Sequence, residues 1–383
     1  MNRLILVALL TLTGGVVAAA TPAETRARTA DIRAAAAAIL NECKTLGGGD
    51  WVAWHQQLED FRVGLRPTVE SGMARVAPFK ASPTTVQSPL LRVDTAPPMF
   101  ELPSYAMYPL YMHTADPTSW ARNLPAAKAM VAVSQWLKAK GIDLIVVPAP
   151  RMIEVYADKI GNGVPANGVA SPQLRRLLLS LMESDVEVVD LLPGFLQSRA
   201  TSAETLYLSA DGHWSDRAQQ IASGEIAHRL ARYDVVKAAM KLPARFTSEA
   251  SHVSFQGALA EMLTPPQRAE VRAALDATPV TKVTTAAGAP FEEPATSPVV
   301  VIGDSFTHYF QLLVAKGSGI DALLSKAINL GVSNVSAAGG TVEPIRDFVR
   351  RPELLRGRRV VVWILNNSLL ADPADSWQLP PLR

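Results

Sequence analysis

Short apolar runs and longer helical stretches alternate along most of the chain. The runs have the length and the Val, Ile and Leu content of strands buried on both faces of a sheet. The predicted strands are residues 141–148, 186–191, 298–303, 327–330 and 359–365, and the predicted helices are residues 124–140, 173–182, 216–232, 309–315 and 342–350. Strands that alternate with helices predict an α/β fold, with a mainly parallel sheet flanked by helices.

The N-terminal part of the chain has a different pattern. Residues 24–46 are rich in alanine and end at three glycines, which predicts a helix with a glycine stop. The many prolines between residues 77 and 103 predict an irregular connection, and residues 278–297 are also expected to form a loop. We therefore divide the mature chain into an N-terminal helical and irregular extension, residues 21–104, and one α/β domain, residues 105–383.

Residues 1–20 have the three parts of a secretory signal peptide. Arg3 supplies the positive charge, residues 4–17 form the apolar segment, and residues 18–20 are the alanines expected at a cleavage site. The apolar segment is short for a membrane span, and an uncleaved N-terminal anchor is the alternative. Both interpretations predict that the protein is exported.

Composition narrows the function further. Of 383 residues, 48% are hydrophobic and 19% are charged, which predicts a sizeable core. The net charge is only +2, with Lys and Arg spread along the chain, and this argues against nucleic acid as a partner. Cys43 is the single cysteine, so no internal disulfide is expected. The sequence contains no glycine-rich phosphate loop and no HExxH or CxxC pattern, so neither a cofactor nor a metal is expected.

Two short motifs carry candidate chemistry. Gly303-Asp304-Ser305-Phe306 follows a predicted buried strand, and open α/β sheets bind ligands at the carboxyl ends of such strands. In Asp211-Gly212-His213-Trp214 the carboxylate is two residues before the imidazole, so in an extended segment both point to the same side. Taken alone, the first motif is also typical of a helix cap, and the second of a polar loop or part of a metal site. Together they predict a Ser-His-Asp site for acyl transfer.

The same motifs resemble those of a known family. Gly303-Asp304-Ser305-Phe306 resembles the first sequence block of SGNH (GDSL-type) hydrolases, and Asp211-Gly212-His213-Trp214 resembles the Asp-x-His-Trp motif of bacterial alginate O-acetyltransferases. In ordinary SGNH hydrolases the Asp-His block follows the serine, whereas here it precedes the serine, as in the alginate acetyltransferases. The resemblance runs from about residue 105 to residue 365. It implies an SGNH-hydrolase-like (flavodoxin-like) catalytic domain with its triad motifs in reversed chain order.

The resemblance also implies roles and partners. Ser305 would be the nucleophile, His213 the general base and Asp211 its orienting carboxylate. Acetate would pass through the serine to a hydroxyl of an exopolysaccharide in the periplasm, and a membrane-bound O-acyltransferase would deliver the acyl group. The sequence 366–368 (Asn-Asn-Ser) lacks the acidic and basic residues expected after the last strand, which leaves the acceptor sugar open.

Further residues are candidates for an oxyanion hole. The resemblance requires a glycine and an asparagine there, and Gly339 or Gly340 and Asn334 are the candidates. A glycine-rich turn would let backbone N–H groups approach a substrate. A turn that simply leads into the next helix is an equally good interpretation.

Other candidates would contact the substrate directly. Arg151 follows a predicted strand, where it would meet a carboxylate or acyl oxygen or else form a surface ion pair. Trp214 would stack on a sugar or pack in the core. His308, three residues after Ser305, would contact the substrate or else be a core or second-layer histidine. Tyr156 is a candidate for the rim of the site.

Three functions remain open on sequence alone. The leading prediction is an exported O-acetyltransferase that modifies alginate or a related polymer. An acetylesterase of the same fold would use water in place of the sugar. A polysaccharide-binding scaffold without turnover is the third, although such a protein has no need of all three residues Asp211, His213 and Ser305.

Overall fold

The computed structural model describes residues 20–60, 63, 90–101, 124–160, 170–337, 339–371 and 374–382. The predicted signal segment up to residue 19 and most of the proline-rich connection lie outside these residues. Within the described part of the chain, no helix has both the length and the apolar character needed to cross a membrane.

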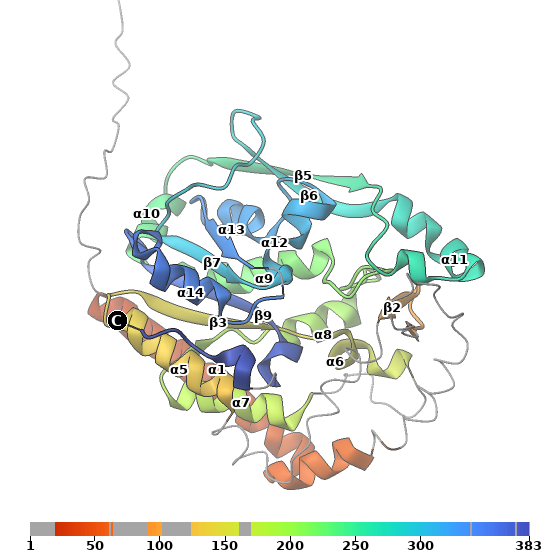
Figure 1. The fold of residues 1–383 in the computed structure, drawn as a ribbon, viewed down its shortest axis with the longest axis horizontal. Helices are drawn as coiled ribbons and strands as arrows, with labels where there is room; N and C mark the ends of the chain where they lie inside the picture. The colour runs from red at the N-terminus through yellow and green to blue at the C-terminus, as the bar shows by residue number, and fades with distance from the viewer. Residues whose placement is uncertain are drawn as a thin grey trace, which may run out of the picture.

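A sheet of five parallel strands forms the centre of the molecule, in the order β4-β3-β9-β7-β8 (Figure 1). The strands are β3 (Asp143–Ala149), β4 (Glu187–Val188), β7 (Val299–Gly303), β8 (Ser333–Ser336) and β9 (Val360–Asn366). β9 is the middle strand, where Val362 pairs with Ile145 of β3 and with Val301 of β7. The predicted α/β fold with a mainly parallel sheet is confirmed.

Helices cover both faces of this sheet. Successive strand residues point to opposite faces, so each apolar strand serves two cores. Val361 and Trp363 of β9 lie in one core with α1 (Pro22–Gly47), α5 (Pro125–Lys138), α7 (Pro172–Glu183) and α14 (Glu343–Arg350). Val362 and Ile364 lie in the other core with α8 (Leu192–Thr201), α9 (Asp216–Leu230), α12 (Ser305–Tyr309) and α13 (Ile320–Ile328). Each fully buried aliphatic side chain contributes about 1.5–3 kcal/mol, which explains why these strands read as continuous apolar runs.

The remaining elements are short or lie at the periphery. They are β1 (Leu91–Val93), β2 (Met99–Glu101), α6 (Met152–Tyr156), η2 (Ala157–Lys159), α10 (Asp234–Met240), β5 (Phe246–Val253), η3 (Ala260–Met262), α11 (Pro265–Asp276), β6 (Thr278–Thr285), the π-helical turn η4 (Phe310–Val314), η5 (Pro352–Leu355), η6 (Asn367–Ala371) and η7 (Ala374–Trp377). β1 pairs with β2, and β5 pairs with β6, both antiparallel.

Three sequence predictions about elements are wrong. Residues 327–330 do not form a strand, because they are the end of α13 and the turn after it, where Asn329 adopts a left-handed conformation (φ 53°). Residues 278–285 form strand β6 rather than a loop. The helix expected from residue 309 begins at Ser305, because the Asp304 side chain caps it by accepting the Phe306 N–H at 2.8 Å.

Helix α1, from the predicted N-terminal extension, packs on the sheet domain. Glu24 accepts from the Arg359 guanidinium at 2.8 Å, and both side chains are buried. Arg28 pairs with Asp185 at 2.9 Å near the start of β4. At the opposite end of the extension, the Phe100 N–H of β2 donates to the Ser209 carbonyl at 2.9 Å. Residues of the extension therefore stabilise both the helical layer that contains α5, α7 and α14 and the segment that leads to His213.

Candidate active site

The strand β7 delivers Ser305 to the carboxyl edge of the sheet. Gly303 ends the strand against β9, where an added Cβ would lie 1.9 Å from the Ile364 carbonyl oxygen. Only glycine fits this close approach. The following Asp304 carboxylate accepts the Phe306 N–H and the Asn366 N–H, each at 2.8 Å. These bonds join the start of α12 to the end of β9 and fix the position of Ser305.

The segment around His213 is anchored by its tryptophan. Trp214 is fully buried and forms an isolated antiparallel β-bridge with Tyr207. Its ring packs edge-on against Phe306, with 5.4 Å between ring centroids. The next residue, Ser215, caps α9 by accepting the Ala218 N–H at 3.3 Å. The loop is therefore held between α9 and the start of α12, with His213 directed at Ser305.

The structure brings Asp211, His213 and Ser305 into one hydrogen-bonded chain. His213 Nε2 lies 2.8 Å from Ser305 Oγ, and His213 Nδ1 lies 2.6 Å from Asp211 Oδ1. Residues far apart in the sequence thus have the geometry of a nucleophile, a base and an orienting carboxylate. The Asp211 bond assigns the Nδ1–H tautomer, which leaves Nε2 free to accept the Ser305 hydroxyl proton.

Asp211 is buried but well supplied with donors. Its side chain accepts the His213 N–H at 2.9 Å, the Ala258 N–H at 2.8 Å and the Tyr309 hydroxyl, besides the His213 ring. Burial alone would raise the pKa of this carboxyl, but the bonds from His213, Ala258 and Tyr309 outweigh burial and lower the pKa. Asp211 is therefore a carboxylate at neutral pH.

Two aromatic residues of α12 enclose the imidazole. The Tyr309 ring stacks on His213, with centroids 3.7 Å apart and planes 13° apart, and the Phe306 centroid lies 5.1 Å away. Tyr309 was not among the sequence candidates. Its position four residues after Ser305 was the available signal, because such residues share one side of a helix.

A cavity of about 250 Å³ opens in front of Ser305 and His213. Its lining residues come from six separate segments of the chain: Arg151; Asp211, Gly212 and His213; Ala258 and Leu259; Asp304, Ser305 and Phe306; Gly339; and Asn366, Ser368 and Leu369. The cavity is large enough for an acetyl group together with part of a sugar ring.

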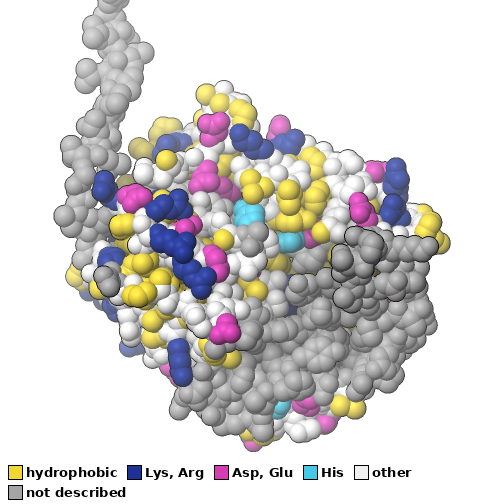
Figure 2. All heavy atoms as spheres, viewed as in Figure 1, with side chains coloured by type: hydrophobic (Ala, Val, Ile, Leu, Met, Phe, Trp, Pro, Cys, Tyr) yellow, Lys and Arg dark blue, Asp and Glu magenta, His cyan; other side chains and the backbone are white. Residues whose placement is uncertain are grey.

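On the face of the molecule in Figure 2, acidic and basic side chains are interspersed, and histidine side chains reach the surface among hydrophobic ones.

Ionisable groups are buried in the wall of this cavity, at Arg151 and Asp304, and directly behind it, at Glu154. Arg151 is 3% exposed, so its alternative role in a surface ion pair is excluded. Burial lowers the pKa of Arg151 to about 10, and the guanidinium stays charged at neutral pH. Burial raises the pKa of Asp304 to about 6 and that of Glu154 to about 7. Glu154 accepts the Arg151 N–H at 2.7 Å and the Asn367 amide at 2.9 Å.

The oxyanion-hole candidates separate into two groups. Gly339 lines the cavity, whereas Gly340 lies outside the lining and donates its N–H to the Ala337 carbonyl at 3.0 Å. Asn334 is also outside the lining: its Nδ2 donates to the Thr307 carbonyl at 3.1 Å, and its Oδ1 accepts the Ser336 hydroxyl. Asn334 therefore joins β8 to α12 behind Ser305, and the structure does not bring it into the cavity with Gly339.

Asn366, which is not one of the predicted site residues, occupies the cavity instead. Its Oδ1 accepts the Ser368 N–H at 2.9 Å and the Ser368 hydroxyl at 3.0 Å, which fixes the orientation of the amide. Among the described residues, no protein group accepts a hydrogen bond from its NH₂. The signal in the sequence was its place directly after β9, because the carboxyl ends of adjacent parallel strands meet at one edge of a sheet.

The other predicted contact residues lie away from the cavity. Trp214 is fully buried, so it packs in the core and has no surface for a sugar. Tyr156 is 4% exposed, and its hydroxyl accepts the Leu206 N–H at 3.3 Å, which excludes a place on the rim. His308 is half-buried and is not a lining residue, and burial together with the charge of His213 lowers its pKa.

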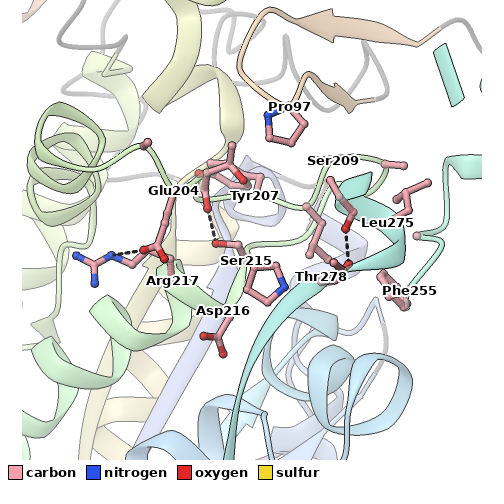
Figure 3. Close-up of a pocket in the computed structure, with 18 of the residues that line it drawn as sticks. Pro97, Glu204, Tyr207, Ser209, Ser215, Asp216, Arg217, Phe255, Leu275 and Thr278 are labelled. Atoms are coloured by element: carbon pink, nitrogen blue, oxygen red, sulfur yellow. Dashed lines mark hydrogen bonds and ion pairs between the residues drawn. The ribbon is translucent and has the colours of Figure 1, made fainter. Parts of the chain in front are cut away.

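A second cavity, of about 270 Å³, is lined in part by the segments that precede and follow the Asp211–Trp214 motif (Figure 3). Pro97, Tyr207, Ser209 and Phe255 are among its lining residues, and Ser215 donates to the Thr205 carbonyl at its wall. The Leu259 N–H bonds to the Ala210 carbonyl at 2.9 Å between the two cavities. Across the described residues, no three or more His, Cys, Asp or Glu side chains form a group that could hold a metal ion.

The chain is similar to known acetyltransferase-related proteins in sequence and in fold. The chain is 28% identical to the probable alginate O-acetylase AlgJ of Pseudomonas fluorescens over 130 residues, which span 34% of this chain and 32% of that relative. The fold matches the O-acetyltransferase domain of Pseudomonas putida AlgJ (TM-score 0.50, 21% identity, 70% of this chain and 90% of that one). It also matches Pseudomonas aeruginosa AlgX (TM-score 0.51, 14% identity, 75% and 63%).

The family comparison covers most of the α/β domain. Residues 110–367 match the family model described as the SGNH hydrolase-like domain of the acetyltransferase AlgX. The match includes both motifs and the end of β9, and it confirms the SGNH-like fold that the motifs predicted. The chain therefore belongs to the AlgX family of SGNH hydrolase-like acetyltransferase domains.

Proposed function

We propose that this protein is an exported O-acetyltransferase that acetylates hydroxyl groups of a bacterial exopolysaccharide through an acyl-serine intermediate. The observation that carries the proposal is the chain of hydrogen bonds from Asp211 through His213 to Ser305 at the mouth of a cavity. Membership in the AlgX family supports acetyl transfer as the reaction.

In the first half-reaction, His213 Nε2 removes the hydroxyl proton of Ser305 while Oγ attacks the carbonyl carbon of the acetyl donor. The negative charge moves to the carbonyl oxygen, where donors already in place stabilise it. The Asn366 NH₂ and the Gly339 N–H are the donors we assign. The bond to the leaving group then breaks, and the proton on His213 passes to that group, leaving acetyl-Ser305 and neutral His213.

In the second half-reaction, a sugar hydroxyl takes the place of the leaving group. His213 removes its proton, the sugar oxygen attacks the acetyl carbonyl carbon, and the bond to Ser305 Oγ breaks. The proton returns from His213 to Oγ, which restores the free enzyme. Asp211 stays ionised throughout because its donors lower its pKa, and it stabilises the transient imidazolium.

The acceptor and the donor system follow from the same proposal. We propose alginate or a related polymer as acceptor, and the buried Arg151 charge in the wall suits an anionic or strongly polar ligand. Export, by a cleaved signal or with an uncleaved inner-membrane anchor, would place the enzyme in the periplasm, away from cytoplasmic acyl donors. A membrane-bound O-acyltransferase is therefore the proposed source of acetyl groups, and the chemistry requires no cofactor.

The test uses the mature chain with a chromogenic acetyl ester, with and without de-acetylated alginate oligosaccharides. An acetyl mass gain on the oligosaccharides that Ser305→Ala abolishes would support the transferase. Ser248→Ala, in β5 and outside the cavity, is the matched control and is expected to behave like the native protein. Acetate release without a mass gain on any oligosaccharide would favour an esterase, and polymer binding without any turnover would favour a scaffold.

A further inference from the structure

Tyr309 contacts both His213 and Asp211, the two residues that follow Ser305 in the hydrogen-bonded chain. Its hydroxyl donates to Asp211 Oδ2, and its ring lies parallel to the His213 imidazole at 3.7 Å. Asp211 Oδ1 is the oxygen that binds the His213 ring, so the tyrosine holds the opposite oxygen. One side chain therefore limits the rotation of the carboxylate and defines the plane of the imidazole.

From this double contact we propose that Tyr309 is a positioning residue that keeps His213 in its productive orientation and limits the charge that Asp211 presents to it. The inference rests on the proposed function, because it assigns a role within the same acyl-transfer site. The proposal adds Tyr309 as a fourth member to the group of Asp211, His213 and Ser305. Through Tyr309, Asp211 and His213 both contact the helix that carries Ser305.

The surroundings of Tyr309 hold its side chain in one position. Its ring is 8% exposed, and Phe255 meets it edge-on at 5.9 Å and 90°. Burial, the charge of Asp211 and the bond to Asp211 raise the pKa of the phenol well above its usual range. The hydroxyl therefore remains a donor wherever the enzyme works, and it adds no titration of its own to the pH profile.

Charged and titratable groups face His213 from several elements. Asp211 lies on its own loop, Asp304 and His308 lie at the start of α12 and within it, and Arg151 lines the same cavity. The segment packed against Asp211 from the other side contributes the backbone N–H of Ala258. The effect of a substitution at Tyr309 on the pH profile can thus be compared with the charges that surround His213 in the native protein.

Two substitutions separate the hydroxyl from the ring. Tyr309→Phe keeps the stacked ring but removes one donor from Asp211, whose charge then favours protonated His213 more strongly. The acid limb of kcat/KM for a chromogenic acetyl ester should move up by roughly half a pH unit. Tyr309→Leu also removes the aromatic face that stabilises the imidazolium, so the acid limb of its pH profile should lie at lower pH than that of Tyr309→Phe. Because the imidazole also loses its fixed plane, kcat should fall about tenfold or more in Tyr309→Leu with little change in KM.

Tyr233→Phe is the matched control. The Tyr233 hydroxyl also donates to a carboxylate, that of Asp143 at 3.0 Å, but Asp143 is the first residue of β3, at the opposite end of the strand from the cavity. Its pH profile should coincide with the native profile. Labelling of Ser305 by a sulfonyl fluoride, followed by mass spectrometry over the same pH range, reports nucleophile activation without acyl transfer.

The outcomes distinguish the two proposals. Native turnover and labelling with no displacement of the acid limb in Tyr309→Phe would overturn the role of Tyr309 and leave the proposed function intact. Equal displacement in Tyr309→Phe and Tyr233→Phe would likewise overturn it, since a general loss of packing would then be the cause. Absence of both turnover and labelling in the native protein would instead contradict the proposed function.

Discussion

Two asparagines near Ser305 have different surroundings, and this contrast can be tested residue by residue. Asn366 lines the cavity with its NH₂ unbound among the described residues, whereas the Asn334 amide bonds to Thr307 behind α12. In Asn366→Asp, one carboxylate oxygen can still accept from Ser368, but the donor is lost and a negative charge faces the oxyanion. We expect kcat to fall by about 10²–10³, the usual effect of losing one oxyanion donor.

The measurement is the single-turnover rate of acetyl-Ser305 formation, with Asn334→Asp as control. Asn334→Asp should lower thermal stability more than it lowers this rate per folded molecule. If Asn334→Asp slows acylation and Asn366→Asp leaves it unchanged, the assignment of Asn366 as an oxyanion donor is wrong.

At the level of single residues, the two motifs are sufficient to select Asp211, His213 and Ser305 from the sequence alone. Asn366 and Tyr309 cannot be selected in this way, because their roles depend on which strand lies next to β7 and on which side of α12 faces the loop. Trp214 is a sequence candidate because it lies beside His213, yet it is fully buried. A residue's proximity to a motif in sequence thus predicts its neighbourhood but not the direction of its side chain.

At the level of elements, sequence patterns predict best where burial is complete. β3, β7 and β9 are nearly fully buried on both faces, and each is visible as an apolar run. β6 is not predicted because its residues alternate between buried and partly exposed and include a proline, so it lacks a continuous run. The end of α13 reads as a strand because a short apolar run in a buried helix cannot be distinguished from one in a strand by periodicity.

Helix α1 gives a prediction at this scale, because buried ion pairs attach it to the sheet. Arg359 contacts Glu24 at 2.8 Å and Asp143 at 3.3 Å, and its side chain is 7% exposed. Arg359→Met would leave two carboxylates without their cation, so we expect a loss of about 3–5 kcal/mol in the free energy of unfolding. Urea denaturation at pH 7 measures this, with the exposed Arg351→Met as control. Similar losses in both variants would show that the pairs do not hold α1.

At the level of the whole molecule, stability should depend on pH through buried acids of two kinds. Donors lower the pKa of Asp211 and Glu24 although burial opposes them, and these acids stabilise the fold once ionised. Burial raises the pKa of Asp304 to about 6 and that of Asp321 to about 7. For an acid whose folded-state pKa is raised, the unfolded state releases its proton first, so stability falls as pH rises between the two pKa values.

Asp321 is the clearest case of the second kind. It lies in the first turn of α13 and is fully buried, with the negative Glu293 nearby, and the backbone N–H groups of Asp321 and Ala322 compensate for only part of the burial. The carboxyl is therefore neutral in the folded protein below about pH 7, and folding between its ordinary pKa of 3.8 and that value requires uptake of a proton. Between its ordinary pKa of 3.8 and the folded value of about 7, this group should cost the fold up to roughly 4 kcal/mol.

Asp321→Asn removes this titration while keeping the shape of the side chain. The variant should match the native protein near pH 4 and become progressively more stable than it up to pH 7, after which the difference should stay constant. Thermal unfolding followed by circular dichroism at pH 4 to 8 measures the difference, with the exposed Asp276→Asn as control. A difference that is the same at every pH would mean that Asp321 is ionised inside the fold, and a cation or donor would then have to lie beside α13.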